Sequence, residues 1–215
     1  ILNGARTPMG GFQGALKDMS ATELGAAAIK AAVERSGVSV DNIDEVIMGC
    51  ILTAGLGQGP ARQAMRKAGL NDATGAVTIN KLCGSGLKAV MQAHDGIKAG
   101  SFNVAVAGGM ESMTNAPYIM PGSRGGYRMG HKEVKDHMFL DGLEDAETGK
   151  LMGQFAQEMA NEKGYTREQM DDFAIESLNR ALTAIKDGHF KDEVTPVTFK
   201  TRKGEQSVDT DEQPA

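Results

Sequence analysis

The stretch TINKLCGSGLKAVMQA (residues 78–93) places a cysteine, Cys83, between an apolar extended run and a long helical pattern. A thiol at the start of a helix lies near unpaired N–H groups and the positive end of the helix dipole, and both favour the thiolate. Gly84 and Gly86 leave room for an acyl carbonyl, and the Cys83 amide could bind a developing oxyanion. The pattern predicts a reactive nucleophile; the alternative is a small residue chosen for tight packing at a strand–helix corner.

The second cysteine and the four histidines give no comparable signal. Cys50 lies in an apolar run beside Met48 and Ile51, which predicts a buried, unreactive thiol. Two cysteines at this spacing match neither a disulfide framework nor a zinc motif, so we expect a reducing, cytoplasmic setting. None of the histidines has a partner residue at metal-ligand spacing, which predicts solvated or packing roles and no metal for His94, His131, His137 and His189.

Charge and hydropathy argue against several classes of function. The net charge of −5 argues against nucleic-acid binding. No apolar run approaches the roughly 18 residues that span a bilayer, and no leader pattern opens the chain, so we expect neither a membrane partner nor secretion. GLGQGP (residues 55–60) is an imperfect dinucleotide fingerprint, and there is no phosphate-binding loop motif, so we expect no nucleotide cofactor. Both ends of the chain interrupt predicted elements, so we expect a piece of a longer protein.

The first 118 residues alternate between helical and extended patterns. A capping box, Ser20 with Glu23, begins the first helix, and Pro60 suits the first turn of the second. We expect helices over residues 21–36, 60–68 and 84–99, and strands over residues 45–51, 75–80 and 102–109. Helices alternating with strands indicate a parallel α/β fold, and continuous apolar strands indicate a sheet that is covered on both faces.

The pattern changes near residue 118, where we place a domain boundary. Residues 116–150 show no sustained periodicity, which is typical of a functional loop or an insertion. Helices are expected over residues 153–163 and 167–188, the second capped by Thr166 with Gln169. Residues 193–200 (EVTPVTFK) predict one strand.

Five segments, in order along the chain, together resemble the thiolase family, the acetyl-CoA acetyltransferases and 3-ketoacyl-CoA thiolases. They are residues 5–16 (ARTPMGGFQGAL), 57–64 (GQGPARQA), 79–90 (INKLCGSGLKAV), 106–118 (VAGGMESMTNAPY) and 121–130 (PGSRGGYRMG). The pattern N-K-x-C-G-S-G is highly specific, and the resemblance covers essentially the whole chain. It implies that Cys83 accepts an acyl group from coenzyme A as a thioester.

The resemblance implies a layered α-β-α-β-α fold made of two similar α/β halves, with a loop domain inserted in the first half. Residues 1–118 would form the first βαβαβ half without its last strand. Residues 119–215 would form the loop-rich, helical domain that binds coenzyme A and mediates oligomerisation. The resemblance also implies a homo-oligomer, either a dimer or a tetramer.

The resemblance assigns further site residues in the stretch DGLEDAETGKLMG (residues 141–153). Leu143 would contact coenzyme A, and Met152 would line the acyl pocket. Leu151, Met152 and Gly153 stand where many acetoacetyl-specific members have His-Met-Gly. The family motifs Asn-Glu-Ala-Phe, Gly-His-Pro and Cys-x-Gly-Gly, which carry the catalytic histidine and second cysteine, do not occur here.

The resemblance therefore implies an acetyl-CoA C-acetyltransferase that acts on acetyl-CoA, CoA and 3-ketoacyl-CoA, with no permanently bound cofactor. Because the catalytic histidine and second cysteine are absent, we expect this chain alone to be a partial enzyme without turnover. Two alternatives stay open: a non-catalytic module for CoA binding or oligomerisation, and a redox-responsive protein whose thiol is simply oxidised.

Overall fold

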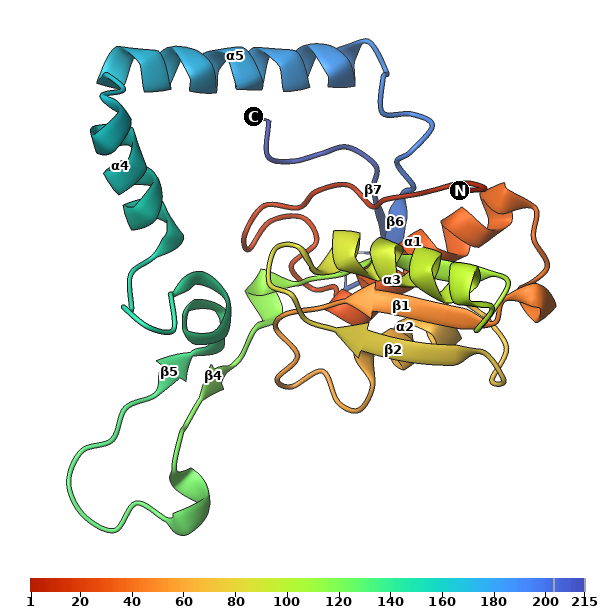
Figure 1. The fold of residues 1–215 in the computed structure, drawn as a ribbon, viewed down its shortest axis with the longest axis horizontal. Coiled ribbons are helices and arrows are strands. Elements are labelled where there is room, and N and C mark those ends of the chain that lie inside the picture. Colours follow the sequence, from red (N-terminus) through yellow and green to blue (C-terminus); the bar gives the residue numbers. More distant parts are fainter. Residues whose placement is uncertain (203, 215) are drawn as a thin grey trace.

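The computed structural model of the chain describes residues 1–202 and 204–214 (Figure 1). Near its centre lies a parallel sheet with the strand order β2-β1-β3. Its strands are β1 (Glu45–Gly49), β2 (Gly75–Ile79) and β3 (Ala105–Gly109). Both neighbours pair with β1 in parallel over its full length, which confirms the predicted parallel α/β fold.

Helices cover both faces of the sheet, as the apolar strands predict. On one face, Val46 packs into a core with α1 (Ala21–Ser36) and α2 (Pro60–Lys67). On the other face, Ile47 packs against α3 (Ser85–Ala99). Successive side chains of a strand point to opposite faces, so the buried strand β1 contributes to both cores.

The predicted helix starts are confirmed by their hydrogen bonds. At α1, the Ser20 hydroxyl accepts a hydrogen bond from the Glu23 N–H, and the Glu23 carboxylate accepts one from the Ser20 N–H at 2.8 Å. Thr166 and Gln169 form the same reciprocal pair at the start of α5 (Arg167–Lys186). Each pair satisfies N–H groups that the first turn of a helix leaves without an intrahelical partner.

All three strands of the sheet are shorter than the sequence predicts. β2 ends one residue early, and at β1 and β3 carboxylates bind the next N–H groups. β3 begins after the predicted residue 102, since Asp44 accepts hydrogen bonds from the N–H groups of Asn103 and Val104 at 2.8 and 3.0 Å. β1 ends before the predicted residue 51, since the Glu111 carboxylate binds the N–H groups that follow the strand. Side chains therefore replace ladder hydrogen bonds at these ends.

The prediction of one strand over residues 193–200 is wrong about where the strand begins, and it did not include the second strand with which it pairs. The structure has β6 (Val197–Thr201), which pairs antiparallel with an unpredicted strand, β7 (Gly204–Val208). Residues 193–195 pair instead with the backbone of Arg6: the Arg6 N–H donates to the Glu193 carbonyl at 2.9 Å, and the Thr195 N–H donates to the Arg6 carbonyl at 2.8 Å.

The region after β3 contains short elements that its irregular pattern conceals. β4 (Tyr118–Ile119) pairs antiparallel with β5 (Lys135–Asp136), and a π-helical turn, η4 (Phe139–Leu143), follows. The two helices predicted next are confirmed as α4 (Met152–Lys163) and α5. Figure 1 shows α4 and α5 extending away from the sheet layers, and most of their residues are exposed.

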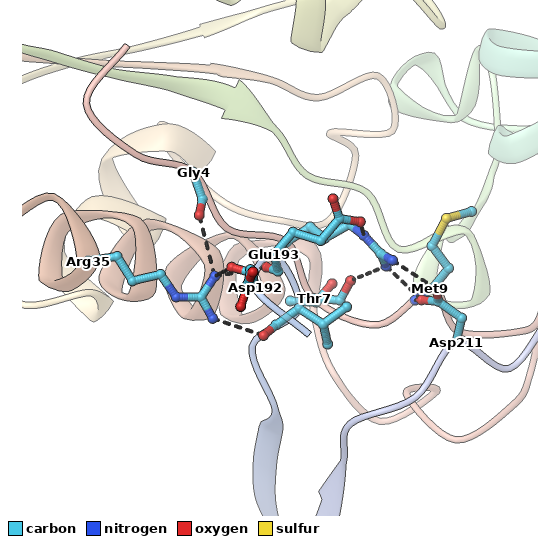
Figure 2. A network of polar contacts seen from close by, with 9 residues as sticks. Gly4, Thr7, Met9, Arg35, Asp192, Glu193 and Asp211 are labelled. Atoms are coloured by element: carbon cyan, nitrogen blue, oxygen red, sulfur yellow. Dashed lines mark hydrogen bonds and ion pairs between the residues drawn. The ribbon is translucent and has the colours of Figure 1, made fainter. Parts of the chain in front are cut away.

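The last part of the chain returns to the first part, where Glu193 and Asp211 lie near Thr7 and Met9 (Figure 2). The guanidinium of Arg6 binds the Asp211 carboxylate at both oxygens, at 2.6 and 2.9 Å, and its Nε donates to Glu193 at 2.7 Å. The guanidinium carbon of Arg6 lies over the Phe190 ring, 5.0 Å from the ring centroid. The hydrogen bond from Arg6 is the main reason that the pKa of Asp211 is lowered, while partial burial opposes the shift.

A second arginine, on α1, extends this network. The Arg35 guanidinium donates to the carbonyl oxygens of Asp192, Glu193 and Val194 at 2.8 to 3.0 Å (Figure 2). These contacts join residues on both sides of the boundary that we predict near residue 118. The division into a core half and a loop domain therefore stays a prediction. The contacts of Arg6 and Arg35 with the last part of the chain are observed in the structure.

We expect Arg6→Ala to destabilise the chain by about 2 kcal/mol at neutral pH, because it strands the Asp211 side chain, which is only 10% exposed. A carboxylate whose pKa is lowered on folding adds stability above its unfolded pKa, near 3.9, and loses it as the pH falls through its folded pKa. The difference between variant and parent should therefore shrink below about pH 4. Urea unfolding at neutral and acidic pH measures it.

The control for Arg6→Ala is Arg180→Ala, which removes an exposed i,i+4 ion pair with Glu176. An exposed pair of this kind contributes about 0.5 kcal/mol at most. Equal effects of the two substitutions would contradict the structural importance of Arg6.

Candidate active site

Cys83 lies in a tight turn between β2 and α3, and its side chain is exposed. The residue before it, Leu82, has a φ of 48°, a left-handed conformation that is uncommon for leucine. The Asn80 side chain accepts a hydrogen bond from the Leu82 N–H at 2.9 Å. The hydroxyl of buried Ser85 accepts one from the Lys81 N–H at 2.8 Å and donates one to the Leu82 carbonyl at 2.6 Å. These bonds hold the thiol at an exposed corner.

Glycines let the start of α3 approach the ends of two strands. A methyl group added at Gly49, the last residue of β1, would lie 2.5 Å from Ser85 Cβ and 2.8 Å from the Gly86 nitrogen. A methyl group added at Gly109, the last residue of β3, would lie 3.3 Å from Gly86 Cα. The helix start is thus fixed at the carboxyl ends of the strands, the edge of a parallel sheet where ligands usually bind.

Cys50 is buried, as its apolar surroundings predict, with 1% of its surface exposed. Burial raises the pKa of its thiol to about 12, and the neighbouring Glu111 carboxylate adds to the shift. The thiol donates to Glu111 Oε1 at 3.5 Å. The two cysteines therefore differ sharply in solvent access, and only Cys83 presents its sulfur at the surface.

The structure brings the other two predicted site residues together. Leu143 and Met152 line the same cavity of about 430 Å³, where Met152 is the first residue of α4 and Leu143 the last of η4. Leu151, the position at which many acetoacetyl-specific relatives have histidine, also faces this cavity. The remaining lining residues are Phe139, Gly153 and Gln154.

A second cavity, of about 520 Å³, lies beside the first and shares Leu143 with it. Its walls come from the N-terminal segment around residues 7–12 and from residues 111–114 after β3. Cys83 lines neither of these two cavities in the part of the chain that the structure describes. The structure therefore places the residues predicted to contact CoA and the acyl group at one cavity, and Cys83, the predicted nucleophile, outside both cavities.

Two ionisable residues beside the cavities were not predicted as site residues. Glu111 lines the second cavity and accepts hydrogen bonds from the N–H groups of Ile51 and Leu52 at 2.8 and 3.1 Å. His137 is buried, with both ring nitrogens hydrogen-bonded. Of the two roles predicted for the histidines, solvated or packing, its burial agrees with packing. Nothing local in the sequence marks the bonds of Glu111 to the loop after β1 or of His137 to Ala54, because they join residues more than 50 positions apart, whereas Asp141 is only four positions from His137.

The remaining expectations concern metals and membranes. Within residues 1–202 and 204–214, no group of three or more His, Cys, Asp or Glu side chains is arranged to hold a metal ion. In the same residues, no helix combines the length and apolar character needed to cross a membrane. The other three histidines are exposed, as predicted for solvated side chains: His94, His131 and His189.

An exposed thiol follows a left-handed residue in a turn at the carboxyl ends of parallel strands. This arrangement places the chain among α/β proteins with a candidate cysteine nucleophile. The model of the family described as "Thiolase, N-terminal domain" matches residues 1–215, and the chain belongs to the thiolase family. The resemblance stated from the sequence motifs is thereby confirmed.

Several curated relatives are about 50% identical to this chain over the residues that align with it. An acetyl-CoA acetyltransferase of Pseudomonas aeruginosa is 50% identical over 215 residues, which are 100% of this chain and 55% of that protein. One of Cupriavidus necator is 52% identical over 205 residues, 95% of this chain and 52% of that protein. One of Yarrowia lipolytica is 50% identical over 214 residues. The chain spans about half the length of the curated relatives it matches.

Proposed function

We propose that this chain is the thioester-forming part of an acetyl-CoA acetyltransferase and that Cys83 is its nucleophile. The observation that carries the proposal is the exposed thiol on a turn that Asn80 and Ser85 hold in a strained conformation. The names of the relatives support acetyl-CoA as the substrate.

In the proposed reaction, the Cys83 thiolate attacks the carbonyl carbon of acetyl-CoA and forms a new C–S bond. The bond from the carbonyl carbon to the coenzyme A sulfur breaks, and CoA leaves as a thiolate that takes up a proton. The N–H groups at the start of α3 would stabilise the oxyanion that forms during the attack. Leu143 would contact coenzyme A, and Met152 would line the acyl pocket; their shared cavity supports this assignment.

The second half-reaction needs a catalytic histidine and a second cysteine. The family motifs that carry these two residues do not occur in the 215 residues of this chain. In the whole enzyme, a second acetyl-CoA loses a proton from its methyl carbon, and the carbanion attacks the acetyl-cysteine. A C–C bond forms, the bond from the acetyl carbon to the Cys83 sulfur breaks, and acetoacetyl-CoA leaves while the cysteine thiolate is regenerated. Removal of a proton from a weakly acidic carbon requires a positioned base. The reverse direction would cleave 3-ketoacyl-CoA. We therefore propose that this chain alone forms the thioester once and does not turn over.

The test is incubation of the chain with acetyl-CoA, followed by intact-mass and peptide mass spectrometry. We expect one acetyl group per chain, located on Cys83, with release of one CoA. An assay for cleavage of acetoacetyl-CoA with added CoA should show no steady turnover. Absence of the acetyl group would favour a non-catalytic module or a redox-responsive thiol, and steady turnover would contradict the partial-enzyme proposal.

We also propose that the protein forms homo-oligomers and resides in the cytoplasm. Strand β2 lies at an edge of the described sheet, with Val77 exposed, and α3 exposes Leu87 and Met91. Unpaired edges and apolar surface of this kind favour association. Light scattering at micromolar concentration should therefore show a dimer or larger species, and a clean monomer would count against it. The free state of both cysteines supports the compartment, which cell fractionation would check.

A further inference from the structure

His137 occupies a buried position just before η4, where it is 6% exposed. Its Nε2 lies 3.3 Å from the Ala54 nitrogen, and its Nδ1 lies 2.5 Å from an oxygen of Asp141. A backbone N–H can only donate, so Nε2 must accept the hydrogen bond from Ala54. A neutral imidazole then carries its proton on Nδ1 and donates it to the Asp141 carboxylate.

These bonds make His137 the meeting point of three chain segments. Its ring binds the loop after β1 through Ala54, and its backbone N–H donates to the Pro117 carbonyl at 3.2 Å. Its partner Asp141 lies within η4. The same loop is also bound by Glu111, which follows β3, so two ionisable side chains hold its first part, residues 51–54.

The π-helical turn η4 forms part of the cavity wall. Phe139 and Leu143, its first and last residues, both line the cavity that also holds Met152. The turn closes with a hydrogen bond from the Glu144 N–H to the Phe139 carbonyl at 2.8 Å. Turns of this type are rare, and they occur often at functional sites. Contact with the loop after β1 is close, since a methyl group added at Gly142 would lie 3.4 Å from Leu52 Cδ2.

We propose that His137, held in its Nδ1–H form by Asp141, is a positioning residue for the substrate cavity. It fastens η4 to the loop after β1 and thereby sets the place of Leu143 at the cavity wall. The ligand class, a coenzyme A thioester, rests on the proposed function. The arrangement of His137, Asp141 and Ala54 does not, and it can be tested separately.

The first experiment tests the arrangement without any ligand. In ¹⁵N NMR spectra of the chain, we expect His137 to carry its proton on Nδ1. In His137→Asn, which keeps a donor near Nδ1 and loses the acceptor at Nε2, hydrogen exchange at the Ala54 and Glu144 amides should accelerate about tenfold. His137→Gln, which keeps an acceptor near Nε2, should exchange at nearly the parent rate. A proton on Nε2, or equal exchange in both variants, would overturn the proposal.

The second experiment measures how the acetylation rate of Cys83 depends on acetyl-CoA concentration. We expect His137→Asn to raise the half-saturating concentration about tenfold and to leave the limiting rate unchanged, with His137→Gln closer to the parent. Acetylation by a short acetyl thioester without the CoA nucleotide should be unaffected. His94→Gln, at an exposed histidine paired with Asp95, is the control and should change nothing.

The outcomes separate the two proposals. If acetyl-CoA fails to acetylate the parent chain, the proposed function fails, and the NMR and exchange results alone decide the role of His137. If the parent is acetylated and His137→Asn lowers only the limiting rate, the positioning role is wrong, because the histidine then acts on the chemical step.

Discussion

Replacing Cys83 with serine is expected to reduce acetyl transfer from acetyl-CoA to this chain by at least about 10³-fold, the scale on which loss of a nucleophile acts in other enzymes. Cysteine sulfur is intrinsically a strong nucleophile toward an acyl carbonyl. A serine hydroxyl in the same turn stays protonated without an adjacent base. Intact-mass spectrometry over a time course measures the acetyl group directly.

The matched control is Cys50→Ser at the other cysteine. Because Cys50 is buried and the pKa of its thiol is raised to about 12, it presents no thiolate to acetyl-CoA. Acetylation should therefore continue in the Cys50 variant at close to the parent rate. Retention of the acetyl group in Cys83→Ser, or its loss in Cys50→Ser, would remove Cys83 from the proposed role.

A single methyl group at Gly49 is expected to affect both stability and the thiol. In Gly49→Ala, the new carbon would lie 2.5 Å from Ser85 Cβ and 2.7 Å from the Ser85 carbonyl carbon, so the start of α3 must shift. Overpacking of this kind costs about 1–3 kcal/mol. The shift would also displace Cys83 from its corner, and we expect acetylation to slow by about tenfold or more. Urea unfolding and the acetylation time course measure the two effects.

The comparison for Gly49→Ala is Gly108→Ala in the neighbouring strand β3. A methyl group there would lie 3.7 Å from Met48 Sδ, an ordinary van der Waals distance. The substitution is chemically the same, so it controls for the added methyl group and for the lost backbone freedom. Equal destabilisation in the two variants would show that close contact between β1 and α3 does not set the position of the thiol.

The parts of the fold that were predictable are those whose determinants are local. The capping boxes, the apolar strands and the glycines that end helices lie within a few residues of the structure they specify. Strand β7 was missed because its residues are polar and exposed, and only its pairing with β6 makes it a strand. The ends of β1 and β3 were misplaced because carboxylates distant in sequence bind their neighbouring N–H groups.

The candidate site shows the same division. The exposed position of the Cys83 thiol was predictable from the helix start and the flanking glycines, and the burial of Cys50 was predictable from its apolar neighbours. Leu143 and Met152 were assigned by family resemblance alone, and their common cavity is a feature of tertiary structure. His137 was expected to be either solvated or packed, because its partner Ala54 lies 83 positions away and nothing near either residue indicates the contact.

The pairing of Arg6 with Asp211 has a consequence for biosynthesis, because 205 positions separate the two residues. Ribosomes add about 5–20 residues per second, so Arg6 emerges roughly 10–40 s before its partner is made. During that interval the sheet and its covering helices can already assemble from residues 20–110, while the first residues of the chain still lack their carboxylate. The segment around Arg6 is therefore among the last parts of this chain to become fixed, although it is synthesised before the sheet.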